Sequence, residues 1–496
     1  MEKYKKLIKN IAYFLAGNVS SKLLVFLLVP YYTHVLSTEE YGTADLISTT
    51  AFMLIPIVTL SITEAVFRFS MDEKAELKAM FTNGISTICF GNILLLVLMP
   101  LLARFEAIKS YVWLLFGLTF ADGIYNMAAQ FVRGCGRSKL YAIGGVVQTA
   151  ALVSLNLIFL LVLKLGVKGY ILSMTLSYVV ALVLLVIKGK LVDYIGKPDF
   201  YLLKQMLLYS IPMIPSGLSW WAMASADKYV ILAYVGAAAN GIYLVAQKIP
   251  TILNVFITIF HQAWQISAVD ENKESSTKEF SEDIYKYLQL CVFLTASAIV
   301  VILKPLYRVW VSNEYYSAWI YTPMLLLATV YSCLSKFMTT NYMVTKKTAG
   351  NLKVTITGCV VNLGLNLILI PMCGLQGAAF ATFFGYLITF IMTYNDVKVG
   401  TGMKIPLFKL IVSTLILLLQ GFILSLPSSA WIPMEVGILL LHSYIYHRDI
   451  SLLFKRIVSY VKYSGGGYSK SNLRFPVPSI RQVKYASRLR CTCVMP

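Results

Sequence analysis

The stretch from residue 18 to residue 68 constrains the fold of this chain more than any other. It holds two apolar spans, one that begins near Ile11 and one that runs from Thr43 to Phe67, separated by the polar turn Ser37-Thr38-Glu39-Glu40-Tyr41-Gly42. Each span is close to the ~20 residues that a helix needs to cross a bilayer, and the turn is too short to be a domain. The stretch therefore predicts a transmembrane helical hairpin.

Part of this hairpin recurs later in the chain. The motif Ser37-x-x-x-Tyr41-Gly42 aligns with Gly236-x-x-x-Asn240-Gly241, a shift of 199 residues, and apolar spans again flank the turn. A second pair aligns Asn156, ahead of Gly166-Val-Lys-Gly169, with Asn366, ahead of Gly374-Leu-Gln-Gly377, at shifts of 210 and 208 residues. We therefore expect two similar bundles in tandem, which is the common plan of secondary transporters.

The composition is that of a polytopic membrane protein. Hydrophobic residues make up 58% of the chain and charged residues 13%, and the mean hydropathy is +0.71. We predict an all-α fold of two six-helix bundles plus two extra C-terminal helices, with fourteen spans in all, or twelve if the last two do not cross. The predicted spans cover residues 11–36, 43–67, 80–103, 111–131, 141–163, 168–187, 206–235, 240–265, 285–303, 317–338, 354–372, 376–394, 406–426 and 430–446.

These spans suggest five regions along the chain. They are an N-terminal transmembrane bundle (1–190), a cytoplasmic linker (191–204), a C-terminal transmembrane bundle (205–400), an extra helix pair (401–450) and a basic cytoplasmic tail (451–496).

The distribution of basic residues predicts the orientation. With the amino terminus inside, the cytoplasmic segments hold 34 of the 43 lysines and arginines, which follows the positive-inside rule and places both termini in the cytoplasm. A net charge of +20 would suggest nucleic acid as a partner in a soluble protein, but this placement explains the charge without one. We expect membrane lipids to surround the spans.

Neither an enzyme nor a metal site is expected. The eight cysteines are scattered, and Cys491 and Cys493 have no second ligand pair. The four histidines are dispersed and the predicted external loops are too short to hold a catalytic domain. No cofactor is therefore expected.

Ionisable residues inside the spans are the candidates for function, because a charge at the centre of a membrane helix costs about 2.5–3.5 kcal/mol on insertion scales. Lys22, Lys228 and Lys248 lie deepest and would give a positive lumen suited to an anionic passenger such as a lipid phosphate or pyrophosphate. Alternatively, Asp227 neutralises one lysine and another only snorkels to an interface. The remaining candidates are His34, Asp45, Glu64, Arg68, Asp122 and His261, of which Glu64 and Arg68 could pair only with each other.

Aromatic residues could also line a cavity, although tyrosines are more often found in the interfacial belts. The candidates are Tyr31, Tyr32, Tyr125, Tyr229, Tyr243, Trp220 and Trp221.

Several of these residues occur in an order that resembles a known family. The opening stretch has Lys22, then VPYYTHVLSTEEYG, Asp45 and Arg68; later come Asp227-Lys228 with Gly241-Ile-Tyr243, and Asn366 ahead of Gly374-Leu-Gln-Gly377-Ala-Ala. Over about residues 10 to 400, this order resembles the Wzx-type polysaccharide biosynthesis flippases of the multidrug/oligosaccharidyl-lipid/polysaccharide (MOP) superfamily.

The resemblance implies a two-bundle fold, alternating access and a lipid-linked passenger. The expected passenger is an undecaprenyl-pyrophosphate-linked oligosaccharide, moved from the inner to the outer leaflet for capsule, exopolysaccharide or O-antigen assembly. Lys22, Arg68, Lys228 and Lys248 would bind it. Asp45, Asp122 and Asp227 become candidates for coupling to a proton or sodium gradient. Other polysaccharide-assembly membrane proteins would be partners.

Three alternatives remain at this point. A lipid II flippase would differ only in the sugar, and a drug/cation antiporter of the same superfamily would be expected to prefer acidic lumen residues over three lysines. A membrane glycan polymerase or ligase would need a large external loop, and the longest one here, about residues 303–316, is too small.

Overall fold

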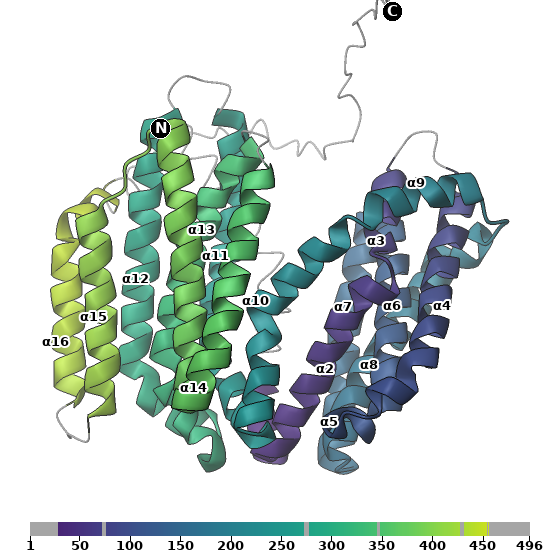
Figure 1. Cartoon of the computed structure of the whole chain (residues 1–496), viewed down its shortest axis with the longest axis horizontal. Helices are drawn as coiled ribbons and strands as arrows, with labels where there is room; N and C mark the ends of the chain where they lie inside the picture. The colour runs from purple at the N-terminus through teal and green to yellow at the C-terminus, as the bar shows by residue number, and fades with distance from the viewer. Residues whose placement is uncertain are drawn as a thin grey trace, which may run out of the picture. The chain divides into compact units, whose positions relative to one another are not determined.

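The computed structural model describes residues 28–71, 76–271, 277–344, 348–426, 431–453 and 455. Within these ranges the chain is helical and contains no β-strand, which confirms the all-α prediction. The described residues up to His447 belong to one compact unit, and the few described residues from Arg448 on belong to a second. The helices of both bundles and of the extra pair all lie in the first unit (Figure 1).

The first bundle is formed by helices from the N-terminal part of the chain. They are α2 (Thr38–Val58), α3 (Ile62–Phe69), α4 (Leu77–Leu102), the short α5 (Glu106–Lys109), α6 (Val112–Gly134), α7 (Ser138–Asn156) with a π-helical end (Leu157–Val162), and α8 (Gly166–Gly189). A short 3₁₀ turn (Leu191–Tyr194) and α9 (Phe200–Ser210) follow, and α9 packs against α3 and α4.

The second bundle contains the longer helices. They are α10 (Met213–Tyr234), α11 (Ala237–Glu271), α12 (Thr277–Trp310), a 3₁₀ segment (Asn313–Ile320), α13 (Thr322–Val344) and α14 (Thr348–Thr401). The extra pair, α15 (Leu407–Ser425) and α16 (Trp431–Ile445), packs against α12. The boundaries of the five regions that the sequence suggested stay predictions.

The helix α2 begins with a complete capping box. Ser37 Oγ accepts a hydrogen bond from the backbone N–H of Glu40 (3.2 Å), and the Glu40 carboxylate accepts one from the backbone N–H of Ser37 (3.0 Å). The polar turn of the predicted hairpin therefore fixes the start of α2, one turn ahead of the residues of the site.

The predicted span 43–67 is not one continuous helix. It is broken between Val58 and Ile62, where Leu60 and Ser61 have left-handed backbone angles, with φ of 49° and 50°. Gly91 of α4 packs directly on this break, since a Cβ there would lie 1.8 Å from the backbone oxygen of Val58. Such close backbone contact shields the freed polar groups, which is how broken helices are tolerated in membranes.

Three other predicted spans also differ from single straight helices. Residues 206–235 are divided between α9 and α10 at Ile211 and Pro212, as the prolines indicate. The spans 354–372 and 376–394 form one long helix, α14, interrupted at Gly374 (φ 58°, ψ −137°). Only glycine adopts these angles readily, which accounts for its place in the repeat.

Eight helices within the described ranges are long and apolar enough to span a membrane, or nine if the bent pair at residues 313–340 is one span. Many large side chains on them, such as Phe90, Ile93 and Val97 of α4, are exposed where lipid would cover them. Fourteen spans stay a prediction, because the first span before residue 28, including Lys22, lies outside the described residues.

Candidate functional site

The two bundles meet where α2 and α11 begin. A Cβ on Gly42 would lie 2.1 Å from the backbone oxygen of Ala237, and one on Gly241 would lie 2.0 Å from that of Thr38. The Asn240 side-chain amide donates to the backbone oxygen of Gly42 (3.0 Å). Gly42 and Gly241 are equivalent in the sequence repeat, so the two repeats contact each other through matching positions.

Tyrosines close the same end of the interface. The Tyr315 hydroxyl lies 2.7 Å from the backbone oxygen of Ser37 and 3.0 Å from that of Leu36. The Tyr41 ring packs against those of Tyr32, Tyr170 and Tyr315, with centroids 5.6–6.1 Å apart.

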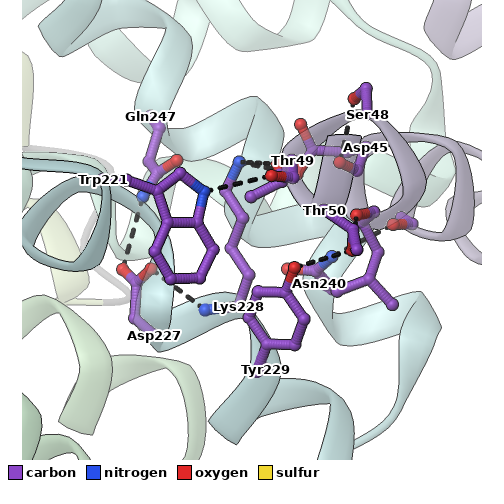
Figure 2. A network of polar contacts seen from close by, with 12 residues as sticks. Asp45, Ser48, Thr49, Thr50, Trp221, Asp227, Lys228, Tyr229, Asn240 and Gln247 are labelled. Atoms are coloured by element: carbon purple, nitrogen blue, oxygen red, sulfur yellow. Dashed lines mark hydrogen bonds and ion pairs between the residues drawn. The ribbon is translucent and has the colours of Figure 1, made fainter. Parts of the chain in front are cut away.

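A buried ion pair links the bundles one turn further along α2. Lys228 Nζ of α10 lies 2.7 Å from a carboxylate oxygen of Asp45, and it donates a hydrogen bond to Thr49 Oγ1 (3.2 Å), as Figure 2 shows. Both charged residues are buried, at 7% and 9% exposure. Asp45 and Thr49 are four residues apart, so both face α10.

Asp227 forms no ion pair with Lys228 in the described structure, although the residues are adjacent in the sequence. Its carboxylate accepts hydrogen bonds from the backbone N–H of Lys228 (3.0 Å) and, more weakly, from the Gln247 amide (3.5 Å). The Lys228 side chain instead points toward α2 (Figure 2). The ion pair of Lys228 is therefore with Asp45 of the first bundle, while Asp227 lies within electrostatic range of Lys228.

Two aromatic side chains of α10 also bind α2. Trp221 Nε1 donates to the backbone oxygen of Thr49 (3.0 Å), and the Tyr229 hydroxyl shares a hydrogen bond of 2.6 Å with Thr50 Oγ1. The two rings meet edge to face, with centroids 5.6 Å apart. These rings add apolar surface and hydrogen-bonding groups beside the ion pair.

Lys248 is the second lysine of this region. It lies on α11, is half-buried, and is within electrostatic range of both Asp45 and Lys228. Among the described residues it has no hydrogen bond or ion pair. The site thus contains one lysine in an ion pair with Asp45 and a second lysine without an ion pair among the described residues.

Asp122 lies away from this interface, in the first bundle. It is buried on α6, and the Asn126 amide one turn later donates a hydrogen bond to its carboxylate. Arg68 and Glu64 are exposed on α3. The structure therefore does not bring Asp122 or Arg68 into contact with Lys228.

The other candidates have local contacts. His34 is exposed and donates to the backbone oxygen of Pro30 (2.6 Å), and His261 of α11 donates to that of Lys336 (2.9 Å). Tyr31 donates to the backbone oxygen of Asn156 (3.0 Å), while Tyr125 packs on Tyr178 inside the first bundle. The Trp220 side chain lies outside the described part of the structure.

The sequence analysis missed several polar members of the site. Thr49, Thr50 and Gln247 were not candidates, because hydroxyls and amides are common in helices and carry no charge. One signal was present: Gly42, Asp45 and Thr49 are spaced by three and four residues, which puts a small and two polar side chains on one face of α2.

Two helical bundles joined through a buried polar interface, with large apolar side chains exposed on their outer helices, define a multi-pass membrane protein. Residues 7–265, more than half of the chain, match the family described as polysaccharide biosynthesis protein, and the chain belongs to this family. The family resemblance predicted from the sequence is thereby confirmed. No curated protein matches the chain by sequence.

Solved structures of the MOP superfamily share the fold. The lipid II flippase MurJ in an inward closed conformation has a TM-score of 0.64 at 14% identity, covering 88% of this chain and 99% of its own. An inward-facing multidrug resistance MATE transporter of the MOP superfamily scores 0.58 at 15% identity, covering 79% and 93%. A point mutant of the Vibrio cholerae MATE transporter VcmN scores 0.57 at 13% identity, covering 80% and 98%. At these identities, the likeness shows the fold alone.

Proposed function

We propose that this protein transfers an undecaprenyl-pyrophosphate-linked oligosaccharide from the inner to the outer leaflet of a bacterial inner membrane. The family membership supports a role in making a capsule, exopolysaccharide or O-antigen. The observation that carries the proposal is the bundle interface, where Lys228 is paired with Asp45 and Lys248 lies nearby without a partner among the described residues.

Lys248 would make the first contact with the pyrophosphate. A second phosphate oxygen would then compete with Asp45 for Lys228, because a lysine ammonium binds a phosphate at least as well as it binds a carboxylate. Since the Lys228–Asp45 pair joins α10 to α2, replacing Asp45 by substrate would remove a contact that holds the bundles together. Binding of the anion would thus favour rearrangement of the bundles, as alternating access requires.

The sugar and the lipid tail would occupy different surroundings. Trp221 and Tyr229 offer ring faces and hydrogen bonds suited to a sugar, while the polyprenyl chain would stay in the bilayer. Lys22 and Arg68 remain proposed contacts for the phosphates. Asp45, Asp122 and Asp227 remain proposed coupling residues for a proton or sodium gradient, without a cofactor.

The test is transfer of a fluorescent undecaprenyl-pyrophosphate sugar across proteoliposomes. Lys22→Ala, Lys228→Ala and Lys248→Ala are compared with wild type at equal protein level. Loss of one charge-assisted contact, worth about 1.5–3 kcal/mol, should reduce transfer by about tenfold or more. Lys286→Ala is the matched control, because Lys286 pairs with Asp283 at an exposed position (3.4 Å).

A drug/cation antiporter is the second candidate, and the presence of Asp45 and Asp227 beside the two lysines favours it. If the wild type moves no lipid-linked sugar but exchanges a cationic drug for protons or sodium, the antiporter replaces the flippase. A lipid II flippase would use the same pyrophosphate contacts, so the assay is repeated with lipid II to compare the two sugars.

A further inference from the structure

A second buried polar network lies outside the bundle interface, where α15 and α16 pack on α12. Its members are almost fully buried, at 0–1% exposure: Gln289 and Ser297 of α12, Ser413 and Gln420 of α15, and Glu435, His442 and Tyr446 at and after α16. We call this set the accessory network. Nothing in the proposed transfer through Lys228 and Lys248 uses it.

The first half of the accessory network surrounds Glu435. The Gln420 amide donates to one Glu435 carboxylate oxygen (2.9 Å), and Ser297 Oγ donates to the Gln420 oxygen (2.7 Å). The other Glu435 oxygen is buried without a hydrogen-bond partner among the described residues. Lys304 Nζ of α12 lies over the Trp431 ring, 5.4 Å from its centroid, one turn before Glu435.

The second half surrounds His442, two turns or roughly 10 Å further along α16. His442 Nε2 and the Tyr446 hydroxyl each hydrogen-bond Ser413 Oγ (3.0 Å), and the Gln289 amide donates to Tyr446 (2.9 Å). His442 Nδ1 is buried without a partner in the described structure. The ionisable groups near it are Tyr446, Tyr285 of α12, and Lys409, whose Nζ lies 5.3 Å from the Tyr446 ring centroid.

Packing of the extra pair does not by itself require ionisable residues. Amides and hydroxyls would fill the same positions at lower cost, since a buried carboxylate without a cation is strongly unfavourable and a neutral acid is not. Within the described residues, Glu435 has no ion pair and one oxygen free to hold a proton. Ionisable residues buried in a membrane protein commonly mark proton pathways.

We propose that Glu435, with His442 two turns along the same helix, forms a proton-binding site that couples transport to a proton gradient. Glu435 holds a proton as a carboxylic acid in this conformation and releases it when α15 and α16 shift against α12. The O–H bond of Glu435 breaks and leaves a carboxylate, and the proton forms a new O–H bond with water or a new N–H bond at His442 Nδ1, which lies on the same face of α16. The proton-binding site itself is independent of the proposed function, and only the identity of the transported substrate rests on that function.

Proton binding is tested without any substrate, by infrared spectroscopy of the purified protein in lipid. Wild type should show the carbonyl band of a protonated carboxylic acid that is missing from Glu435→Gln. Glu106→Gln, on the exposed helix α5, is the matched control and should keep the band. Identical spectra for wild type and Glu435→Gln would overturn the proposal, whatever the transported substrate is.

Coupling is tested in proteoliposomes with and without an imposed proton gradient. Wild type and Glu106→Gln should transfer faster with the gradient, Glu435→Gln should lose this response, and His442→Gln should have a smaller one. A purely structural role predicts that Gln420→Leu and Glu435→Gln lower the melting temperature alike and that both still respond to the gradient. A normal response to the gradient in Glu435→Gln rejects the coupling site. So does the absence of a response in a wild type that actively transfers substrate. A normal response in His442→Gln shows that His442 is not part of the coupling site.

Discussion

The Asp45–Lys228 pair is the residue contact that most directly relates structure to the proposed transport. Removing two charges from water costs several kcal/mol, so a buried pair is seldom retained for stability alone. Here its members come from different bundles and lie 2.7 Å apart. A pair in this position can hold one arrangement of the bundles and be exchanged for substrate in another.

Breaking the pair from one side should be destabilising. Lys228→Met leaves Asp45 buried without its cation, and the expected loss is about 3 kcal/mol, at the low end of the usual range because Lys248 lies within electrostatic range of Asp45. The double variant Asp45→Asn/Lys228→Met should recover most of this loss. Thermal unfolding in detergent measures both.

Lys286→Met provides the comparison for this prediction. Its pairing with Asp283 is exposed, so removal should change stability by less than about 1 kcal/mol. Equal melting temperatures for Lys228→Met and Lys286→Met would show that the buried pair does not contribute as described.

The cost of intramembrane charge pointed to the buried charged residues of the bundle interface, but it did not show which of them form a pair. Lys228, Lys248 and Asp45 were identifiable because each is a charge in an apolar span. The partner of Lys228 was not, since the pairing with Asp45 depends on how α2 and α10 pack. Glu435 was not among the candidates, although it lies in the predicted span 430–446.

Among the helices, the crossing of α2 and α11 depends on two glycines. In membranes, close packing between helices commonly uses small residues, because apolar side chains gain little by leaving lipid. At Gly42 and Gly241 the backbones themselves are in contact, and the Asn240 amide bridges them. The repeat in the sequence pointed to these glycines, but only the structure shows that they face each other.

Gly42→Ala should weaken this crossing. Its Cβ would overlap the Ala237 oxygen at 2.1 Å, and backbone atoms cannot rotate away as a side chain can. We expect a loss of about 1–3 kcal/mol, typical of overpacking, measured by thermal unfolding. Gly145→Ala of α7 is the control, because its Cβ would meet nothing within 4 Å. Equal melting temperatures for the Gly42→Ala and Gly145→Ala proteins would contradict the close crossing of α2 and α11.

Helix breaks were only partly predictable. Pro212 indicated the separation of α9 from α10, whereas no proline or glycine lies at Leu60 and Ser61, where α2 ends and α3 begins. That break accompanies the contact of Gly91 with the Val58 backbone, which joins residues distant in the sequence. Local patterns therefore give the helices, and tertiary contacts decide where they bend.

For the protein as a whole, alternating access predicts that fixing the bundles together stops transport. Thr50 of α2 and Tyr229 of α10 share a hydrogen bond of 2.6 Å, so cysteines there can be joined by a short bifunctional thiol reagent in a cysteine-free background. Cross-linking should abolish transfer of the lipid-linked sugar, and reductive cleavage of the linker should restore it.

A cross-link inside one bundle serves as the control for this experiment. Gln148 of α7 and Ser177 of α8 are hydrogen-bonded at 3.1 Å within the first bundle. Linking cysteines at these positions should leave transfer intact, because the bundle would move as a unit. Transfer that continues with Thr50 and Tyr229 cross-linked would mean that the bundles do not separate there during transport.

The distribution of basic residues predicts which end of the molecule faces the cytoplasm, and two native cysteines can test it. Cys135 lies in the turn after α6, beside Arg133 and Arg137, and Cys373 is exposed just before the break in α14. In single-cysteine variants within right-side-out vesicles, a membrane-impermeant maleimide should label Cys373 from outside and Cys135 only after the membrane is opened. Cys89, in the middle of α4, should resist labelling in both cases. The reverse pattern would contradict the predicted orientation and place the Gly42–Gly241 crossing on the cytoplasmic side.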